Sequence, residues 1–328
     1  MALIAKPRRI AVTGGAGFIG SHTVEALIAQ SATVLVLDDL SHAAPATLPP
    51  QADLEVTDCG SDHAAELLKR FKPDAVLHLA ARGGVNRAMR DPGEHLRTAV
   101  ASSVAFFKSA TDAGARTVVT ASSGGAVYGD SPTLPAHEQL SPRPRSAYGA
   151  SKAAEELYLA SFRRLHDGVN TLALRYGNVY GPRQDGTGEA GVVAITCTRL
   201  LASQPPIMRG DGEQTRDFVF VLDVVAANLA ALRSTYSGAV NVGTGRETSV
   251  TTVVHTLAQL HKGGLTPQHD PAAPGEVRRG CLATDRARRW LDWRAATTIE
   301  DGLRSTWDWF SAQTAPAAPA GSGTAPAP

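Results

Sequence analysis

Two residues one helical turn apart, Tyr148 and Lys152, are the best candidates for chemistry in this 328-residue sequence. A free tyrosine has a pKa of about 10, so a phenolate that acts as a base near neutral pH needs that pKa lowered by about three units, or about 4 kcal/mol. Because a lysine four residues further on lies on the same helical face, its ammonium can supply much of this stabilisation. The pair could therefore move a proton to and from a substrate hydroxyl.

A glycine-rich loop near the start of the chain is the second chemical feature. The glycines follow a short apolar run at 9–13 and precede a stretch with helical spacing at 22–30. Their GxxGxxG spacing suits a tight turn, a close approach to phosphate and close packing of helix on strand. The alternative is an ordinary glycine-rich turn. We expect a dinucleotide site, and we assign to it Gly14, Gly17, Phe18, Ile19 and Gly20.

Two aspartates follow at positions that suit an adenosine. Asp38 lies roughly 20 residues beyond the loop, where a carboxylate can accept hydrogen bonds from ribose hydroxyls and would repel a 2′-phosphate. This favours NAD over NADP as the cofactor. Asp58 could bind the adenine amino group. The alternative for both residues is a role in an ordinary turn.

The elements that must position these residues alternate between strand and helix. Apolar runs predict strands at 9–13, 33–37, 75–79, 117–121 and 171–175, and helical stretches separate most of them. Continuously apolar strands alternating with helices indicate a parallel sheet covered on both faces. We therefore expect a doubly wound α/β fold, a Rossmann-type NAD-binding domain, over residues 1–177.

The remainder of the chain is richer in proline and glycine. We assign residues 178–311 to a smaller α/β substrate domain, with predicted helices at 192–202 and 250–260. A strand predicted at 239–242 returns to the main sheet, so 216–260 is expected to belong partly to the first domain. Residues 312–328, rich in alanine and proline, are expected to form a disordered tail.

The charge, the cysteines and the apolar runs of the chain limit the kinds of partner and the location that we expect for it. A net charge of +1 gives no basic field for nucleic acid or anionic membranes, and no run approaches the roughly 20 apolar residues of a membrane span. Cys59, Cys197 and Cys281 are odd in number and lack metal-ligand spacing, so neither a disulfide framework nor a metal site is expected. The start of the chain is too short and too charged for a signal peptide. These features favour small-molecule partners and a cytoplasmic location.

Several motifs in order carry a family resemblance. They are TGGAGFIGSH at 13–22, HLAA at 78–81, SSGGAVYGD at 122–130, YGASK at 148–152, RYGNVYGPR at 175–183 and GDGEQTRDFVFV at 210–221. With them, the chain resembles the extended short-chain dehydrogenase/reductases, specifically the NAD-dependent epimerase/dehydratase group and most of all its UDP-glucose (UDP-galactose) 4-epimerases. The resemblance implies NAD as cofactor, a nucleotide-sugar substrate, a transient 4-keto sugar and a homodimer.

The resemblance also assigns individual roles. Leu79, Ala80 and Ala81 of HLAA are expected beside the cofactor, together with Tyr148 and Lys152. Asn178 is expected to contact the substrate. Arg216 is expected to grip its diphosphate, where a planar fork suits phosphate oxygens. The alternatives are a turn residue for Asn178 and a surface ion-pair partner for Arg216. Asp217 is expected to order its loop, and Asn241 to be structural.

The sequence departs from the family pattern around the expected substrate pocket. Gly124 stands where relatives carry a serine or threonine that shares a hydrogen bond with Tyr148 and the substrate. Ser122 or Ser123 could replace it, and we prefer Ser123 because it is closer. Three alanines also depart from the pattern: Ala88 stands where a serine is common, Ala99 where an asparagine is common, and Ala273 where an arginine often helps to bind the nucleotide. Arg278 or Arg279 could restore the lost charge, and we assign Arg278 to the substrate.

The absence of an Asp-Glu pair distinguishes this sequence from the dehydratases of the same group. Dehydratases of this group carry an Asp-Glu pair just before the VYG motif, because eliminating water needs an acid and a base there. Here those positions are Gly125 and Ala126. The sequence therefore predicts a nucleotide-sugar 4-epimerase. The alternatives are a ketoreductase of a specialised sugar pathway and a non-catalytic NAD-binding regulatory protein. The sequence does not specify the substituents at sugar C2, C5 and C6.

Overall fold

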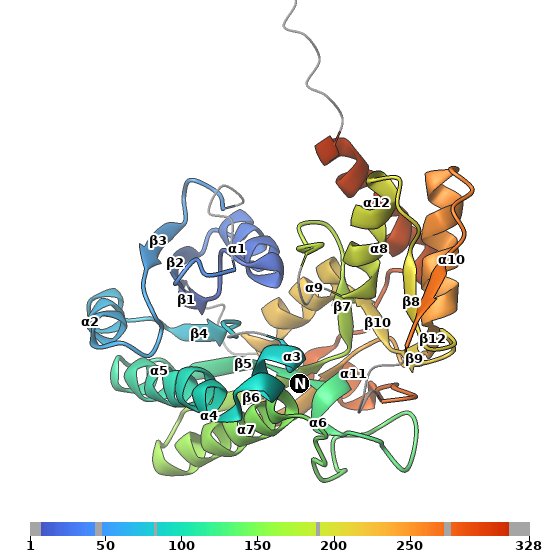
Figure 1. Ribbon diagram of the computed structural model, residues 1–328. Coiled ribbons are helices and arrows are strands. Elements are labelled where there is room, and N and C mark those ends of the chain that lie inside the picture. The colour runs from blue at the N-terminus through green and yellow to red at the C-terminus, as the bar shows by residue number, and fades with distance from the viewer. Residues whose placement is uncertain (1–7, 43–47, 82–83, 188–190, 272–276, 315–328) are drawn as a thin grey trace, which may run out of the picture.

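The chain forms two lobes, with the N-terminal half in one and most of the C-terminal segments in the other (Figure 1). The structure is a computed structural model that describes residues 8–42, 48–81, 84–187, 191–271 and 277–314. Most of the predicted tail, from residue 315 on, and Ala273 lie outside the described residues.

The main sheet confirms the predicted doubly wound fold. Within the described residues its seven strands are parallel and follow the order β11-β6-β5-β4-β1-β2-β3. The order reverses beside β1, the position where such sheets bind ligands at the carboxyl ends of their strands. The strands are β1 (Arg9–Thr13), β2 (Thr33–Asp38), β3 (Asp53–Val56), β4 (Ala75–His78), β5 (Thr117–Ser123), β6 (Asn170–Tyr176) and β11 (Gly238–Val242).

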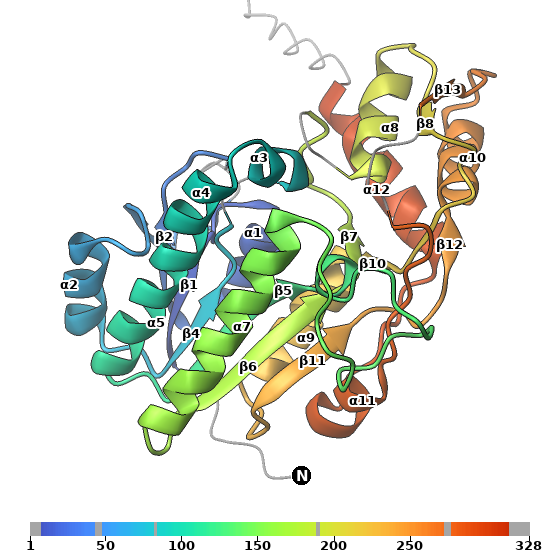
Figure 2. The same ribbon diagram turned by 60° about the horizontal axis from the view of Figure 1, so that its bottom comes forward.

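Helices cover both faces of this sheet. One face carries α2 (Asp62–Phe71), α5 (Ala101–Asp112) and α7 (Ala147–Leu165), and Figure 2 shows α5 and α7 side by side. The other face carries α1 (Phe18–Ala29), α9 (Val221–Ala231) and α11 (Asp285–Leu291). Alternate strand residues feed the two cores: Ala11 packs towards Leu68 and Phe106, whereas Val12 packs towards Val24 and Val224.

Short elements join the carboxyl ends of the strands to α5 and α7. They are α3 (Val85–Arg90), α4 (Pro92–His95), a π-helical turn (Leu96–Val100) and α6 (Gly124–Val127). The π-helical turn leads directly into α5. Such turns are rare and often mark functional sites.

Within the described residues, the second lobe is built from three helices and three small sheets. The paired strands are β7 (Asn178–Tyr180) with β10 (Phe218–Phe220), β8 (Ile207–Arg209) with β13 (Gln268–Asp270), and β9 (Thr215–Arg216) with β12 (Thr248–Ser249). The helices are α8 (Val192–Leu201), α10 (Val250–His261) and α12 (Ile299–Thr314). Its core includes Cys197, Leu200, Val253, Leu257 and Leu303.

Two boundaries and one strand differ from the sequence prediction. Helix α1 begins at Phe18, before the predicted 22, because the helix starts within the glycine motif. Strand β3 was missed because its sequence, Asp-Leu-Glu-Val, is half polar, as an edge strand can be. The tail does not start at 312, since α12 continues through Thr314. Its end precedes Ala315-Pro316, where a proline disfavours helix at the residue before it.

The segment after residue 216 alternates between the lobes. Helix α9 packs on α1, and β11 pairs in parallel with β6, so both belong to the sheet-bearing lobe. Helix α10 packs instead on α8 and α12. No helix in the described part of the chain is both long and apolar enough to cross a membrane.

Candidate active site

The glycine loop is held so closely to its neighbours that two positions exclude a side chain. A Cβ on Gly14, whose φ is +66°, would lie 2.6 Å from the amide nitrogen of Ala80. A Cβ on Gly20 would lie 2.0 Å from the carbonyl oxygen of Gly14. At Gly17 a Cβ would meet only that carbonyl, at 3.3 Å, and Gly17 is the uncapped N-cap of α1. The loop thus leaves the first amides of the helix without a side-chain cap, as an anion site requires.

Asp38 ties the end of β2 to this loop. Its carboxylate is 7% exposed and accepts hydrogen bonds from the amides of Ala16 and Leu40, each at 2.9 Å. A carboxylate can accept further bonds, so the turn role and the ribose role considered for Asp38 are compatible. Asp58 accepts a bond from the amide of Gly60 at 2.8 Å.

One cavity collects the residues assigned to the cofactor. It is lined on one side by Gly14, Gly17, Asp38 and Asp58. Residues of the HLAA motif, Leu79, Ala80 and Ala81, line it as well. Phe18 and Ile19 lie in the first turn of α1 and do not line this cavity. The glycine cradle and the buried carboxylate at the end of β2 fit a dinucleotide such as NAD.

Tyr148 and Lys152 occupy the first turns of α7. Ser146 caps the helix by accepting a hydrogen bond from the amide of Gly149 at 3.1 Å. A Cβ on Gly149 would lie 2.6 Å from the carbonyl oxygen of Ala126, so this glycine allows α7 to approach α6. Tyr148 is half-buried, and its ring lies 6.4 Å from that of His95.

Lys152 is buried and paired with a glutamate that the sequence analysis did not consider. Its ammonium lies 2.9 Å from Oε2 of Glu155, and the two side chains are 5% and 2% exposed. Burial by itself lowers the pKa of Lys152, but Glu155 and Tyr148 more than offset this and raise it. Lys152 is therefore a cation at neutral pH, interacting with both Tyr148 and Glu155.

The two candidate serines point into different surroundings. Ser122 is buried and donates a hydrogen bond to Oε1 of Glu156 at 2.5 Å. Ser123 ends β5, and its hydroxyl lies near Gly125, where a Cβ would be 3.9 Å from it and 3.5 Å from Oδ1 of Asn178. Ser123 and Asn178 thus flank one glycine, which supports our preference for Ser123.

A second cavity collects residues assigned to the substrate. Asn178 and Arg216 line it together with Gly124, Gly125 and Tyr128. Arg216 donates to the carbonyl of Thr215 at 2.8 Å. Beside it, the buried carboxylate of Asp217 accepts bonds from the amides of Thr244, Gly245 and Leu282 at 2.7 to 3.1 Å, which joins three segments at the cavity.

Arg278 and Arg279 differ in position. Arg278 forms a bidentate pair with exposed Asp211, at 2.6 and 2.7 Å, and does not line the second cavity. Arg279 lines that cavity and pairs with Glu247. Of the two arginines, Arg279 is therefore the one that lines the cavity together with Arg216.

The three positions that depart from the family pattern, Ala88, Ala99 and Gly124, are closely surrounded by other parts of the chain or line a cavity. Ala88 is fully buried on α3, which packs against α7, and Ala99 lines the cofactor cavity. A Cβ on Gly124 would lie 2.6 Å from Cδ1 of Leu282, which is 3% exposed. Leu282 therefore occupies the space that a serine or threonine at position 124 would need.

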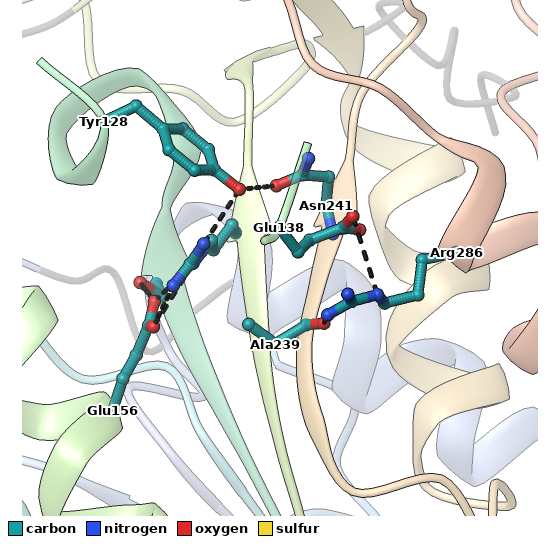
Figure 3. Close-up of polar contacts among 8 residues, drawn as sticks. Tyr128, Glu138, Glu156, Ala239, Asn241 and Arg286 are labelled. Carbon is teal, nitrogen blue, oxygen red and sulfur yellow. Dashed lines mark hydrogen bonds and ion pairs between the residues drawn. The ribbon is translucent and has the colours of Figure 1, made fainter. Parts of the chain in front are cut away.

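A buried polar network supports the second cavity from below. Arg175 binds Glu156 through two nitrogens and donates to the hydroxyl of Tyr128 at 2.8 Å. That hydroxyl donates in turn to Oδ1 of Asn241 at 2.7 Å, as Figure 3 shows. Asn241 also binds the carbonyls of Ala136 and Ala283, which agrees with the structural role expected for it.

Three features of the site were not predicted from the sequence: the ion pair of Glu155, the contact of Leu282 with Gly124, and the position of Arg279 at the second cavity. A signal for Glu155 existed, because it lies three residues after Lys152, a spacing at which helical side chains meet. For Leu282 there was none, since its contact with Gly124 joins segments far apart in the chain. In the described residues, no group of three or more His, Cys, Asp or Glu side chains could hold a metal ion.

Comparisons with known proteins agree with this geometry. The chain is 39% identical over 308 residues to a UDP-glucose 4-epimerase of Mycolicibacterium smegmatis, covering 92% of this chain and 98% of the relative. It is similar to the crystal structure of UDP-glucose 4-epimerase with UDP-glucose from Thermotoga maritima, with a TM-score of 0.88 and 37% identity over 93% and 99% of the two chains.

The Thermus thermophilus UDP-glucose 4-epimerase in complex with NAD is also similar, with a TM-score of 0.87 and 37% identity over 92% and 99% of the two chains. A match to the family described as NAD dependent epimerase/dehydratase covers residues 10–243, from β1 through β11. The chain therefore belongs to the NAD dependent epimerase/dehydratase family.

Proposed function

We propose that this enzyme is a UDP-sugar 4-epimerase of the UDP-glucose/UDP-galactose type. The observation that carries the proposal is the combination of Tyr148 and Lys152 on α7 with Gly125 and Ala126 on α6. The first pair supports proton transfer, and the second lacks the acid and base that dehydration needs. Relatives named UDP-glucose 4-epimerase that match nearly the whole chain support the same choice.

In the proposed reaction, Tyr148 accepts the proton of the sugar 4-hydroxyl and later returns it to the 4-keto sugar. When bound, NAD supplies a reversible acceptor for the C4 hydride. Lys152 stabilises the phenolate form of Tyr148 by its positive charge. Ser123 shares a hydrogen bond with the substrate, in place of the residue missing at Gly124. Asn178 holds the substrate, and Arg216 its diphosphate.

The cofactor would be held by the glycine loop and by the carboxyl ends of β2 and β4. Gly14, Gly17 and Gly20 would leave room for the pyrophosphate, and the amides of Phe18 and Ile19 at the start of α1 would donate to it. Asp38 would accept hydrogen bonds from the ribose hydroxyls, and Asp58, which lines the same cavity, would bind the adenine amino group. We extend the substrate contact proposed for Arg278 to Arg279, because only Arg279 of the two lines the second cavity.

Product analysis tests the activity. Purified protein is incubated with UDP-glucose, UDP-galactose, UDP-N-acetylglucosamine and UDP-glucuronate in separate reactions, without added reductant. We expect conversion of at least one substrate to its C4 epimer without net NADH formation. Stoichiometric NADH consumption with a keto sugar would favour the ketoreductase alternative instead. Absence of any C4 epimer would contradict the proposal.

The apolar surface of α7 supports a homodimer. Leu157 and Leu165 are 73% and 75% exposed, and Met89 and Leu96 on the neighbouring elements are more than half exposed. Exposed apolar patches of this kind mark interaction sites. We expect a Leu157→Glu, Leu165→Glu variant to be monomeric by light scattering. Leu222→Glu, on the opposite face of the sheet, is the matched control and should remain dimeric.

A cytoplasmic location also belongs to the proposal. Its support is the state of the cysteines: Cys59, Cys197 and Cys281 are free thiols in the structure. Free thiols are typical of proteins in reducing compartments. Localisation of a fluorescently tagged chain in the producing cell would test this assignment, and export from the cytoplasm would contradict it.

A further inference from the structure

A continuous line of buried polar side chains connects Lys152 to the strand that precedes the glycine loop. Lys152 pairs with Glu155 at 2.9 Å, and Glu155 is hydrogen-bonded to Ser103 on α5. The hydroxyl of Ser103 lies 2.8 Å from Nε2 of His78, and Nδ1 of His78 lies 2.7 Å from the hydroxyl of Thr13. Each of these side chains belongs to a residue that is less than a tenth exposed.

The direction of the hydrogen bonds follows from the donors at one end. The amide of Ala80 donates to the Thr13 hydroxyl at 3.2 Å, so that hydroxyl is free to donate to Nδ1 of His78. Nε2–H of His78 then donates to Ser103. Burial, and after it the charge of Lys152, lowers the pKa of His78 to about 3, so the ring is neutral. Burial raises the pKa of Glu155, and the ammonium of Lys152, 2.9 Å away, opposes that rise, so the ion pair assigns the negative charge of this line to Glu155.

This line also borders the cavity assigned to the cofactor. His78 and Ser103 line the cavity that contains Gly14 and Asp38. The carbonyl of Ala99, which lines the same cavity, lies 2.9 Å from the Ser103 hydroxyl and shares its single proton with Glu155 as alternative acceptors. The network thus forms part of the wall between the cofactor cavity and the ammonium of Lys152.

The remaining charges near the pair have their own partners. Glu156, the next residue of α7, binds Arg175 through two nitrogens and acts on Lys152 and Glu155 through its charge. The ring of His95 lies 6.4 Å from that of Tyr148, measured between centroids. Glu155 is consequently the carboxylate in direct contact with Lys152.

We propose that Glu155 is a positioning residue for the catalytic pair: through its ion pair it fixes the ammonium of Lys152 and partly cancels the positive charge that Lys152 presents to Tyr148. The inference rests on the proposed function for the role of Tyr148. It goes beyond that function by making the proton affinity of Tyr148 depend on Glu155 as well as on Lys152. An uncompensated Lys152 would hold the phenolate more strongly, and Tyr148 would become a weaker base.

Titration of Tyr148 tests this without a substrate. The chain has six tyrosines, so the tyrosinate absorbance of each NAD-saturated protein is measured against pH and that of its Tyr148→Phe counterpart is subtracted. In Glu155→Gln the phenolate is the negative charge left beside Lys152, and we expect the pKa of Tyr148 to fall by about one unit. If substrate turnover is observed, the ascending limb of its pH profile should move by the same amount.

Conservative and distant variants provide the controls. Glu155→Asp keeps the charge, so it should retain the parental pKa of Tyr148 while turning over more slowly because Lys152 is held less well. Glu66→Gln removes the partner of Lys69 in an exposed ion pair on α2 and should change neither quantity. Far-ultraviolet circular dichroism and thermal unfolding show whether each variant is folded.

The possible outcomes separate cleanly. A Tyr148 pKa that is unchanged or raised in folded Glu155→Gln would overturn the proposal. If that variant does not fold, Ser103→Ala, which removes a hydrogen bond that favours the charged form of Glu155, should lower the Tyr148 pKa by a smaller amount, and no decrease would overturn it. Because the titration needs no sugar, a shift without any C4 epimer would refute the proposed function alone.

Discussion

Two consecutive glutamates of α7, Glu155 and Glu156, enter two buried polar networks of different character. Glu155 joins the cofactor-side network, which runs through Lys152, Ser103 and His78 to Thr13. Glu156 joins the substrate-side network, where it binds Arg175 below the second cavity. Successive helical residues point about 100° apart, so one helix supplies both networks.

The two networks differ in what their cations can do. An arginine keeps its proton under all ordinary conditions, and Arg175 is held by Glu156 and by the ring and hydroxyl of Tyr128. A lysine is a compact charge whose proton affinity changes with its surroundings. The substrate-side network therefore fixes a shape, whereas the cofactor-side network sets an electrostatic potential. The following experiments separate these two functions.

The largest expected effect is on the chemical step at the cofactor side. Tyr148→Phe removes the proton acceptor but keeps the ring, so we expect epimerisation to fall by about 10³-fold or more, within the range for loss of an acid–base group plus its hydrogen bonds. Retained NAD, measured by absorbance after denaturation, should be unchanged. Biological activity that survives this substitution would instead favour the non-catalytic regulatory alternative.

Breaking the substrate-side network should mainly reduce stability. Glu156→Gln leaves the guanidinium of Arg175, which is 5% exposed, without its counter-ion. Removing one partner of a buried ion pair costs about 3 to 5 kcal/mol, and we expect a loss near the lower end because the amide retains some hydrogen bonds. Denaturant unfolding measures this change. The Tyr148 pKa of the folded variant should change less than in Glu155→Gln, because the charge of Glu156 is the smallest of the influences on the pKa of Lys152.

The sequence predicts the sheet and the catalytic pair, but it does not predict which of the two glutamates contacts Lys152. The doubly wound sheet follows from apolar strands that alternate with helices, and the pairing of Tyr148 with Lys152 follows from helical spacing. The spacing cannot tell whether Glu155 or Glu156 meets Lys152, because both lie within about one turn of it. That choice depends on α5, which packs beside α7 and carries Ser103.

Contacts between distant segments were likewise beyond reach from the sequence. His78 meets Ser103 because β4 ends beneath α5, although 25 positions separate them. Leu282 meets Gly124 because Asp217 holds the amide of Leu282 at the cavity. In the sequence Gly124 is only a missing serine or threonine. In the structure it is one half of a packing pair.

Restoring a side chain at position 124 should therefore have an intermediate effect. The added Cβ of Gly124→Ser would overlap Leu282, and overpacking of this kind costs about 1 to 3 kcal/mol. Leu282→Ala in the same chain should recover part of that loss. Gly125→Ala is the matched control, since its Cβ would make contacts no closer than 3.5 Å, and its unfolding free energy should change little. A fully stable Gly124→Ser would show that Leu282 yields easily.

The most gradual effect is a pH dependence confined to the cofactor-side network. Because the folded state lowers the pKa of His78 to about 3, the unfolded chain takes up a proton at this residue first as the pH falls. The sign is therefore a loss of stability below the ordinary histidine pKa of about 6.5, at up to about 1.4 kcal/mol per pH unit as the pH approaches 4.

Denaturant unfolding at pH values of about 7.0, 6.0, 5.0 and 4.5 would measure this slope. These conditions run from above to below the ordinary histidine pKa of about 6.5. In His78→Asn the titrating group is absent, so the variant should be less stable at pH 7 but lose less stability on acidification. The difference between the two chains isolates His78 from other acid-sensitive groups. Parallel pH curves would mean that the folded network accepts the proton, and that its charge is not confined to Lys152 and Glu155.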